Sequence, residues 1–160
     1  MKFMQKQKGF TLIELLIVIT IIAILAATVF VALDPATRFS QSRNSRRWTE
    51  IDSILSAVLQ YQVDNSGSFP NNLDSVTTSS QILGTSTTGC DSGCSVAGTT
   101  TTSCLDMSTQ LVDKYLASIP IDASGGTDAK TLYAINKTAN GRIKVMSCNA
   151  ELSQTISVQR

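Results

Sequence analysis

Apolar residues gather near the N-terminus of this 160-residue chain. From Phe10 to Leu33 the chain runs for 24 residues in which Glu14 is the only charged side chain. A helix rises about 1.5 Å per residue, so a run of this length spans roughly 36 Å, enough to cross a hydrocarbon core of about 30 Å. The pattern predicts a membrane-spanning helix over residues 10–33.

A different periodicity follows this run and predicts an amphipathic helix over residues 34–64. Its apolar positions fall at helical spacing and form one stripe: Ile51, Ile54, Leu55, Val58 and Leu59. At the start, Asp34 and Pro35 allow two interpretations, a helix N-cap followed by proline at the first helical position, or a kink in one long helix. The stretch DNSGSFP predicts an end near Asp64.

Residues 65–160 have the mixed pattern of a small α+β head. Residues 75–103 are rich in Ser, Thr and Gly and predict a surface loop. Residues 105–120 have the apolar spacing of a short helix that ends at Pro120. Runs at 131–136 and 142–148 predict two strands joined at Asn140-Gly141, a hairpin signal, and 154–159 predicts a last short strand. The expected fold is a long N-terminal helix, membrane-spanning and then amphipathic, packed on a small antiparallel sheet.

Charge and composition narrow the function classes. The formal charge is +1, but without residues 1–9 there are ten basic and twelve acidic side chains, so no overall basic field attracts nucleic acid. Histidine is absent, which removes the commonest general base. No phosphate-cradling glycine loop is present either. The sequence therefore favours a structural or binding protein over an enzyme.

The chain has four cysteines: Cys90, Cys94, Cys104 and Cys148. An even number in a small domain next to a membrane segment favours disulfides in an oxidising compartment, with three pairings open. The spacings do not form the two C-x2-C knuckles of a four-cysteine zinc site. Zinc and free thiols are the less favoured alternatives.

Glu14 needs a physical reason, because an acidic residue inside a membrane helix costs up to about 2.5–3.5 kcal/mol. The basic stretch 1–9 precedes the apolar run and ends in Gly9, whereas a secretory signal peptide has its cleavage site after the run. An ordinary signal anchor with a glutamate near the membrane surface is the plain alternative. It explains neither the Gly9-Phe10 junction nor the spacing to Glu14.

The sequence Gly9-Phe10-Thr11-x-x-Glu14, with lysines before it and a long apolar helix after it, resembles the N-terminus of type IV pilins and of the pseudopilins of type II secretion. The resemblance implies a leader, residues 1–9, that a prepilin peptidase removes between Gly9 and Phe10 on the cytoplasmic face. It implies N-methylation of Phe10. It also implies assembly of many copies into a helical filament, in which Glu14 meets the Phe10 amine of a neighbour.

The resemblance implies a structural pilin subunit, built into an extracellular or periplasmic filament by an inner-membrane assembly platform. A pseudopilin of a type II secretion system is the alternative. A monomeric membrane-anchored binding module is a more distant one.

Three weaker candidates remain in the amphipathic helix and the head. The arginines from Arg38 to Arg47 could contact DNA, anionic lipid or neighbouring subunits, or form a solvated face balanced by acidic neighbours. Asp122 and Asp128 lie where major pseudopilins have a calcium loop, but Ala123 replaces the expected proline and few acidic ligands are present. The third candidate is a glycosylation sequon over 136–138.

Overall fold

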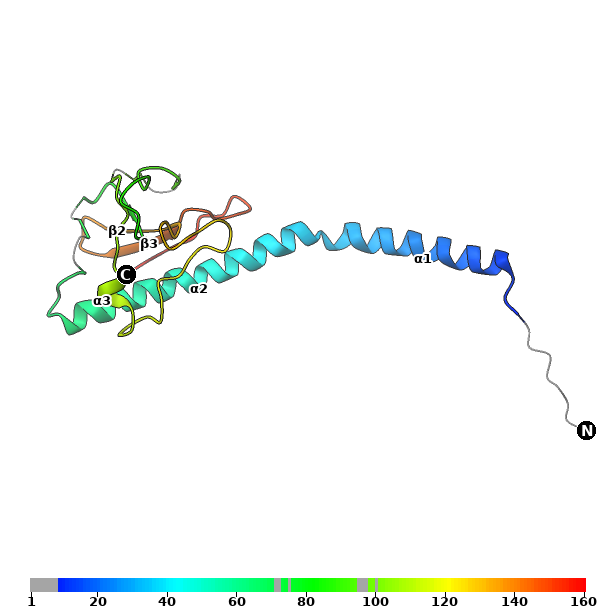
Figure 1. The fold of residues 1–160 in the computed structure, drawn as a ribbon, viewed down its shortest axis with the longest axis horizontal. Coiled ribbons are helices and arrows are strands. Elements are labelled where there is room, and N and C mark those ends of the chain that lie inside the picture. Colours follow the sequence, from blue (N-terminus) through cyan, green and yellow to red (C-terminus); the bar gives the residue numbers. More distant parts are fainter. Residues whose placement is uncertain (1–8, 71–72, 75, 95–97, 100) are drawn as a thin grey trace, which may run out of the picture. The chain divides into compact units, whose positions relative to one another are not determined.

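The computed structural model describes residues 9–70, 73–74, 76–94, 98–99 and 101–160. The chain divides into two compact units, with the boundary between Phe39 and Ser40. The elements are labelled in Figure 1. The fold is α+β and pilin-like, as the sequence predicts.

Helix α1 runs from Leu12 to Leu33 and buries none of its residues. By length and composition it can cross a membrane. Its two internal threonines donate their hydroxyls to carbonyl oxygens of the same helix, Thr20 to Ile17 and Thr28 to Leu25, both at 2.8 Å. These bonds leave no hydroxyl donor exposed to an apolar surrounding, as a helix in lipid requires.

Asp34 separates α1 from helix α2, which runs from Pro35 to Asp64. Asp34 has a left-handed backbone, with φ of +38°, and its carboxylate accepts a hydrogen bond from Thr37 Oγ1 at 2.5 Å. Proline stands at the first helical position, where its missing N–H costs nothing. Arg38 N still donates to Asp34 O at 3.3 Å across this point, so the structure favours the second interpretation, one long helix that bends at Asp34 and Pro35.

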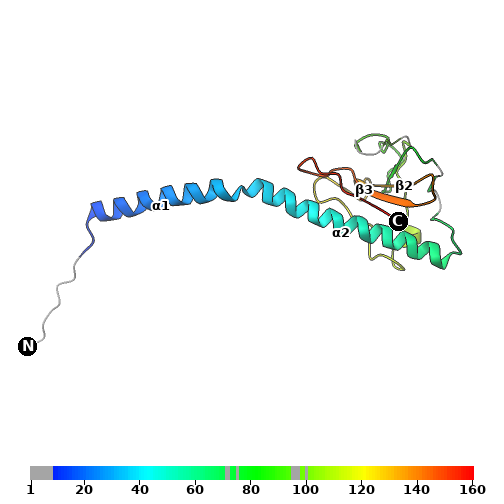
Figure 2. The same cartoon turned by 180° about the vertical axis from the view of Figure 1, so that it is seen from behind.

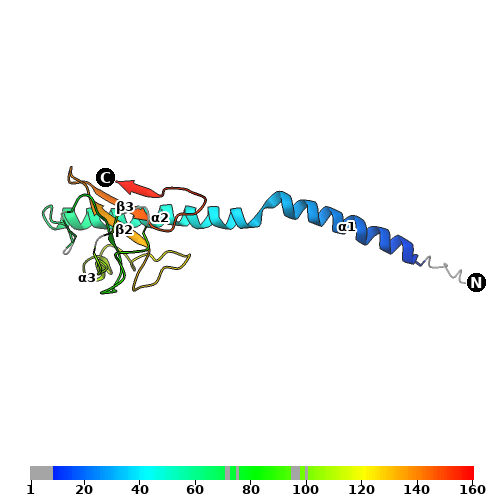
Figure 3. The same cartoon turned by 90° about the horizontal axis from the view of Figure 1, so that it is seen from above.

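The apolar stripe of α2 is the floor of the head core. Ile51, Ile54, Leu55 and Val58 are fully buried against strand residues such as Tyr133. Figure 2 and Figure 3 show strands β2 and β3 lying along this helix from two further directions. The predicted helix end at Asp64 is confirmed.

The head contains one antiparallel sheet in the order β1-β2-β3-β4. The strands are β1 (Gln81–Ile82), β2 (Tyr133–Lys137), β3 (Ile143–Ser147) and β4 (Ser157–Gln159). Strands β2 and β3 form the predicted hairpin, whose turn closes through a hydrogen bond from Gly141 N to Thr138 O at 2.9 Å, with Gly141 at a φ of +76°.

Two expectations are corrected. The stretch 75–103 is not surface loop throughout, because 79–83 is buried and supplies β1. The predicted helix over 105–120 shrinks to α3, Ser108–Leu111. Val112 is extended and Asp113 has a φ of +68°, so the chain leaves the helix while the apolar residues at 105, 107 and 111 remain in the core.

Two disulfides organise the Ser/Thr-rich loop: Cys90–Cys104 and Cys94–Cys148. The expectation of disulfides is confirmed, and the structure selects one of the three pairings. The second bridge ties the loop to the end of β3. It supplies an anchor that the small polar side chains of the loop cannot.

Candidate functional site

The predicted processing and assembly residues lie at the beginning of α1. Gly9 and Phe10 are exposed and precede the helix, and the Phe10 side chain is 87% exposed. The lysines of the leader lie outside the described residues. Both residues of the predicted cleavage junction are therefore accessible to solvent.

Glu14 forms a capping box with Thr11, the N-cap of α1. The Glu14 backbone N donates to Thr11 Oγ1 at 3.3 Å. In return Glu14 Oε2 accepts hydrogen bonds from Thr11 N at 3.2 Å and from Thr11 Oγ1 at 3.1 Å. The pair satisfies donors that every helix start leaves open, and it places a negative charge at the positive end of the helix dipole. Glu14 therefore has a partner within its own chain, which lowers the cost of holding a carboxylate at an apolar helix.

This capping role was missed in the sequence analysis, although the signal is present. Threonine followed three residues later by glutamate, directly before an apolar run, is a capping-box pattern. The spacing between Phe10 and Glu14 drew attention to assembly alone.

The chain thus combines a single carboxylate near the start of an exposed apolar helix with a pilin-like head. The family comparison agrees: residues 4–30 match the model of the prokaryotic N-terminal methylation motif, which is characteristic of type IV pilins and pseudopilins. No curated protein and no solved structure was found to match the chain.

A second cluster, the Arg47 network, lies inside the head. Arg47 is 1% exposed, and its guanidinium forms two hydrogen bonds with the fully buried carboxylate of Asp122, from Nε at 2.5 Å and from Nη2 at 3.0 Å. Its Nη1 reaches Glu151 at 2.7 Å and Asn44 Oδ1 at 2.8 Å. One side chain of α2 thereby holds two loops, the one before β2 and the one between β3 and β4.

Glu151 completes this network from the edge of the head. It accepts from Arg43 Nε at 2.7 Å and Arg43 Nη2 at 2.5 Å, and its backbone N and O both bond the amide group of Asn44. The hydrogen bonds from Arg43 and Arg47 lower the pKa of the Glu151 carboxyl to about 2. The bonds to Asp122 raise the pKa of Arg47 above its ordinary value. Glu151, Arg43 and Arg47 are charged at neutral pH, and charge-assisted hydrogen bonds hold them together.

The network changes the interpretation of the arginine group. Arg47 is buried, Arg43 binds Glu151, and Arg46 pairs with Glu50 four residues along the helix at 2.7 Å. All three side chains therefore have acidic partners within the chain, although Arg43 and Arg46 remain partly exposed to solvent. The signal that the sequence analysis missed is helical spacing. Arg47 and Asn44 lie four and seven residues before Ile51, so they fall on the same buried face of α2 as the apolar stripe.

The contacts of Asp122 do not fit a calcium site. Both of its carboxylate oxygens bind Arg47, and Oδ1 also accepts from Ser124 N at 2.8 Å. Asp128 is exposed, and in the described part of the chain no three acidic, cysteine or histidine side chains gather as metal ligands. Calcium binding at this loop stays a prediction without support from the geometry.

The sequon over 136–138 lies on β2 and in its turn. Asn136 Nδ2, the atom that a glycan would modify, donates to Thr77 O at 3.1 Å, and Oδ1 is buried without a hydrogen-bond partner. The amide is thus engaged in the fold. Glycosylation there stays an untested prediction.

Proposed function

We propose that the chain is a prepilin whose mature form is the structural subunit of a type IV pilus-like filament. The observation that carries this proposal is the placement of Glu14 on α1. It is the only charged side chain of a 22-residue helix that buries nothing within the chain, and it lies four residues after the Gly9-Phe10 junction. So large an exposed apolar surface needs a second apolar environment.

In the proposed pathway the precursor is inserted in the cytoplasmic membrane with its N-terminus in the cytoplasm. A prepilin peptidase cuts between Gly9 and Phe10 and methylates the new amine of Phe10. An inner-membrane assembly platform then moves the subunit from lipid into the filament, where its α1 packs against the α1 helices of other copies. The head lies outside, and the mature protein functions in an extracellular or periplasmic filament.

The chemistry of this step rests on charge neutralisation. Cleavage creates a cationic amine on Phe10 beside a helix whose only charge is the Glu14 carboxylate. When helices stack with a stagger, the amine of one subunit meets Glu14 of its neighbour, and both charges are compensated in a low-dielectric core. The contact joins different surfaces of two copies, so it propagates into a filament instead of closing into a ring.

Mass spectrometry tests the processing step on non-reduced protein sheared from the cell surface. The expected species begins at methylated Phe10 and is about four hydrogens lighter than the reduced chain, because it keeps two disulfides. A chain that begins at Met1 and occurs only in the membrane fraction would instead indicate the anchored binding module.

Substitutions at the capping box separate assembly from helix capping. Glu14→Gln removes the charge but keeps an oxygen that can cap, since glutamine serves in the same box. Thr11→Val removes the hydroxyl that bonds Glu14 and keeps the charge. We expect Glu14→Gln to abolish filaments while processing continues, and Thr11→Val to retain them. Loss of filaments in Thr11→Val alone would assign Glu14 to capping only.

A pseudopilin of a type II secretion system is the second candidate, because the matched N-terminal motif occurs in both groups. Deletion in the native host distinguishes the two. A pilin deletion removes surface filaments, whereas a pseudopilin deletion leaves secreted enzymes in the periplasm.

A further inference from the structure

The charges of the head are separated between the two edges of its sheet. Residues 40–160 carry nine basic and ten acidic side chains, so the head has almost no net charge. Strands β1 and β4 are the outer strands of the sheet. Basic residues gather at the turn end of the β2–β3 hairpin and the adjoining end of β4, and the residues beside β1 form a groove with an acidic rim.

The basic edge consists of Lys137, Arg142, Lys144 and Arg160. The register aligns Lys137 and Arg160 with Ile143, because Lys137 pairs with Ile143 across β2 and β3 and Ile143 exchanges two backbone hydrogen bonds with Arg160. Arg142 and Lys144 flank Ile143 along the chain, so these two share the opposite face of the sheet. Arg160 has a distant ion pair with Asp52 at 3.7 Å, and the Lys137 ammonium lies over the Phe69 ring. Within the described residues, no acidic side chain pairs with Arg142 or Lys144.

The acidic groove lies beside β1 and has a volume of about 240 Å³. Its floor is apolar, formed by Leu83, Leu105 and Met107 among others, and Asp106 and Asp128 stand on its rim. The Asp106 carboxylate accepts a local hydrogen bond from Ser108 N, two residues along the chain, at 2.9 Å. The Asp128 carboxylate is exposed and has no such partner in the described structure.

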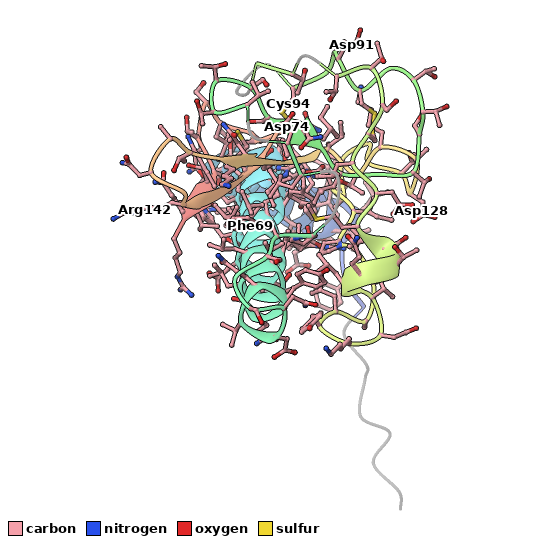
Figure 4. All side chains as sticks on the ribbon, turned by 90° about the vertical axis from the view of Figure 1, so that its left-hand side faces the viewer. Phe69, Asp74, Asp91, Cys94, Asp128 and Arg142 are labelled. Atoms are coloured by element: carbon pink, nitrogen blue, oxygen red, sulfur yellow. A yellow bond between two sulfur atoms is a disulfide. The ribbon has the colours of Figure 1, made fainter. Side chains whose placement is uncertain are left out.

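Figure 4 shows Arg142 and Asp128 on opposite sides of the head. The nearest basic residue along the chain, Lys130, does not neutralise the groove, because its ammonium is held by the carbonyl oxygens of Gly89 and Ser92 at 2.6 and 2.5 Å. The head therefore presents opposite charges on two faces that cannot reach each other within one molecule.

We propose that the acidic groove of one head receives the basic edge of a second copy of this chain. The long stems of Arg142 and Lys144 cover the apolar floor, while their charged ends reach Asp128 and Asp106 on the rim. The contact uses two different surfaces of the same chain, so it repeats from copy to copy without closing. This inference rests on the proposed filament and identifies how neighbouring heads recognise each other.

Charge reversal in the full-length chain tests the contact in cells that assemble filaments. The basic variant carries Arg142→Glu with Lys144→Glu, and the acidic variant carries Asp106→Lys with Asp128→Lys. Each places like charges across the contact, and we expect about tenfold less sheared filament, equivalent to about 1.4 kcal/mol. The quadruple variant restores opposite charges and should recover most of the yield.

Two controls keep the result specific. Asp91→Lys makes one substitution of the same kind as those in the acidic variant, at an exposed residue outside the groove, and it should leave the filament yield unchanged. Retention of both disulfides in every variant, read from the non-reduced mass, shows that the head has folded. Glu14→Gln in parallel tests the proposed function, so a failure of filament formation itself is distinguished from a failure of head recognition.

Three outcomes would overturn the inference. Normal filament yield from the basic or the acidic variant shows that the edges do not meet. Failure of the folded quadruple variant to recover shows that their charges do not pair. The third outcome concerns duplex DNA. If the basic variant alone forms intact filaments that no longer bind DNA in a salt-sensitive way, the basic edge binds nucleic acid instead of a second head.

Discussion

Replacing Arg47 by methionine should destabilise the head severely, because it leaves the carboxylate of Asp122 buried without its cation. Asp122 is fully buried, and its other side-chain contact is the backbone N of Ser124. Breaking a buried pair by removing one partner costs about 3–5 kcal/mol. For a head of this size that is a large fraction of a typical total stability of about 5–15 kcal/mol.

The expected change in the melting temperature Tm is large enough to measure by thermal unfolding. At roughly 4 °C per kcal/mol for a domain of this size, Tm should fall by about 12–20 °C. Full-length precursor in detergent micelles can be followed by the fluorescence of Trp48, which is the only tryptophan and is next to Arg47 in α2. Arg46→Met is the matched control, because Arg46 is 61% exposed and its pair with Glu50 contributes at most about 1 kcal/mol.

A double variant separates the loss of the pair from the loss of packing. Arg47→Met with Asp122→Leu removes both charges, so it should be more stable than Arg47→Met alone by about 1–4 kcal/mol. The reasoning is refuted if Arg47→Met is as stable as Arg46→Met, or if the second substitution gives no recovery.

Two further predictions concern acid and disulfides. The pKa of Glu151 is lowered to about 2, so its stabilising contribution is complete above its ordinary pKa near 4.5 and is lost as the pH falls towards 2. We expect Glu151→Gln to reduce the loss of unfolding free energy between pH 5 and 2 by about 1–2 kcal/mol, and an unchanged pH dependence would contradict this. Replacing both cysteines of Cys94–Cys148 by serine should lower the free energy of unfolding by about 4 kcal/mol, and the same change at Cys90–Cys104 by about 3 kcal/mol. The difference arises because Cys94–Cys148 closes the longer loop. Urea unfolding of the two serine variants measures the difference, and equal losses would argue against the chain-entropy account.

Elements with a strong period were predictable, and elements held by long-range contacts were not. The stripe of α2 and the β2–β3 hairpin each follow from local pattern, and the structure confirms both. Strand β1 was missed because Gln81 and Ile82 lie in a Ser/Thr-rich stretch, where the only reason for a strand is pairing with β2, about fifty residues later. The predicted helix over 105–120 failed because its apolar residues reach the core from an irregular backbone.

The two candidate sites differ in the same way. Phe10 and Glu14 are close along the chain, so their spacing could be read directly. The Arg47 network joins residues separated by 75 positions at Asp122 and 104 positions at Glu151. These residues meet only because two loops of the head pack back against α2, which the local sequence pattern does not predict. Likewise, four cysteines allow three pairings, and only the fold selects one.

The hydrogen bonds between Thr11 and Glu14 also bear on the reversibility of the proposed assembly. Without a partner, the Glu14 carboxylate would destabilise every free subunit in the membrane. Because assembly would relieve this cost, the filament would form almost irreversibly. Thr11 supplies a modest internal partner that a neighbour's amine can replace. The free and assembled states are then brought closer in energy, and a subunit that leaves the filament returns to a membrane helix that already accommodates its charge. The Thr11 hydroxyl at the start of α1 thus keeps the free-energy difference between free and assembled subunits small, so that subunits can both join and leave the filament.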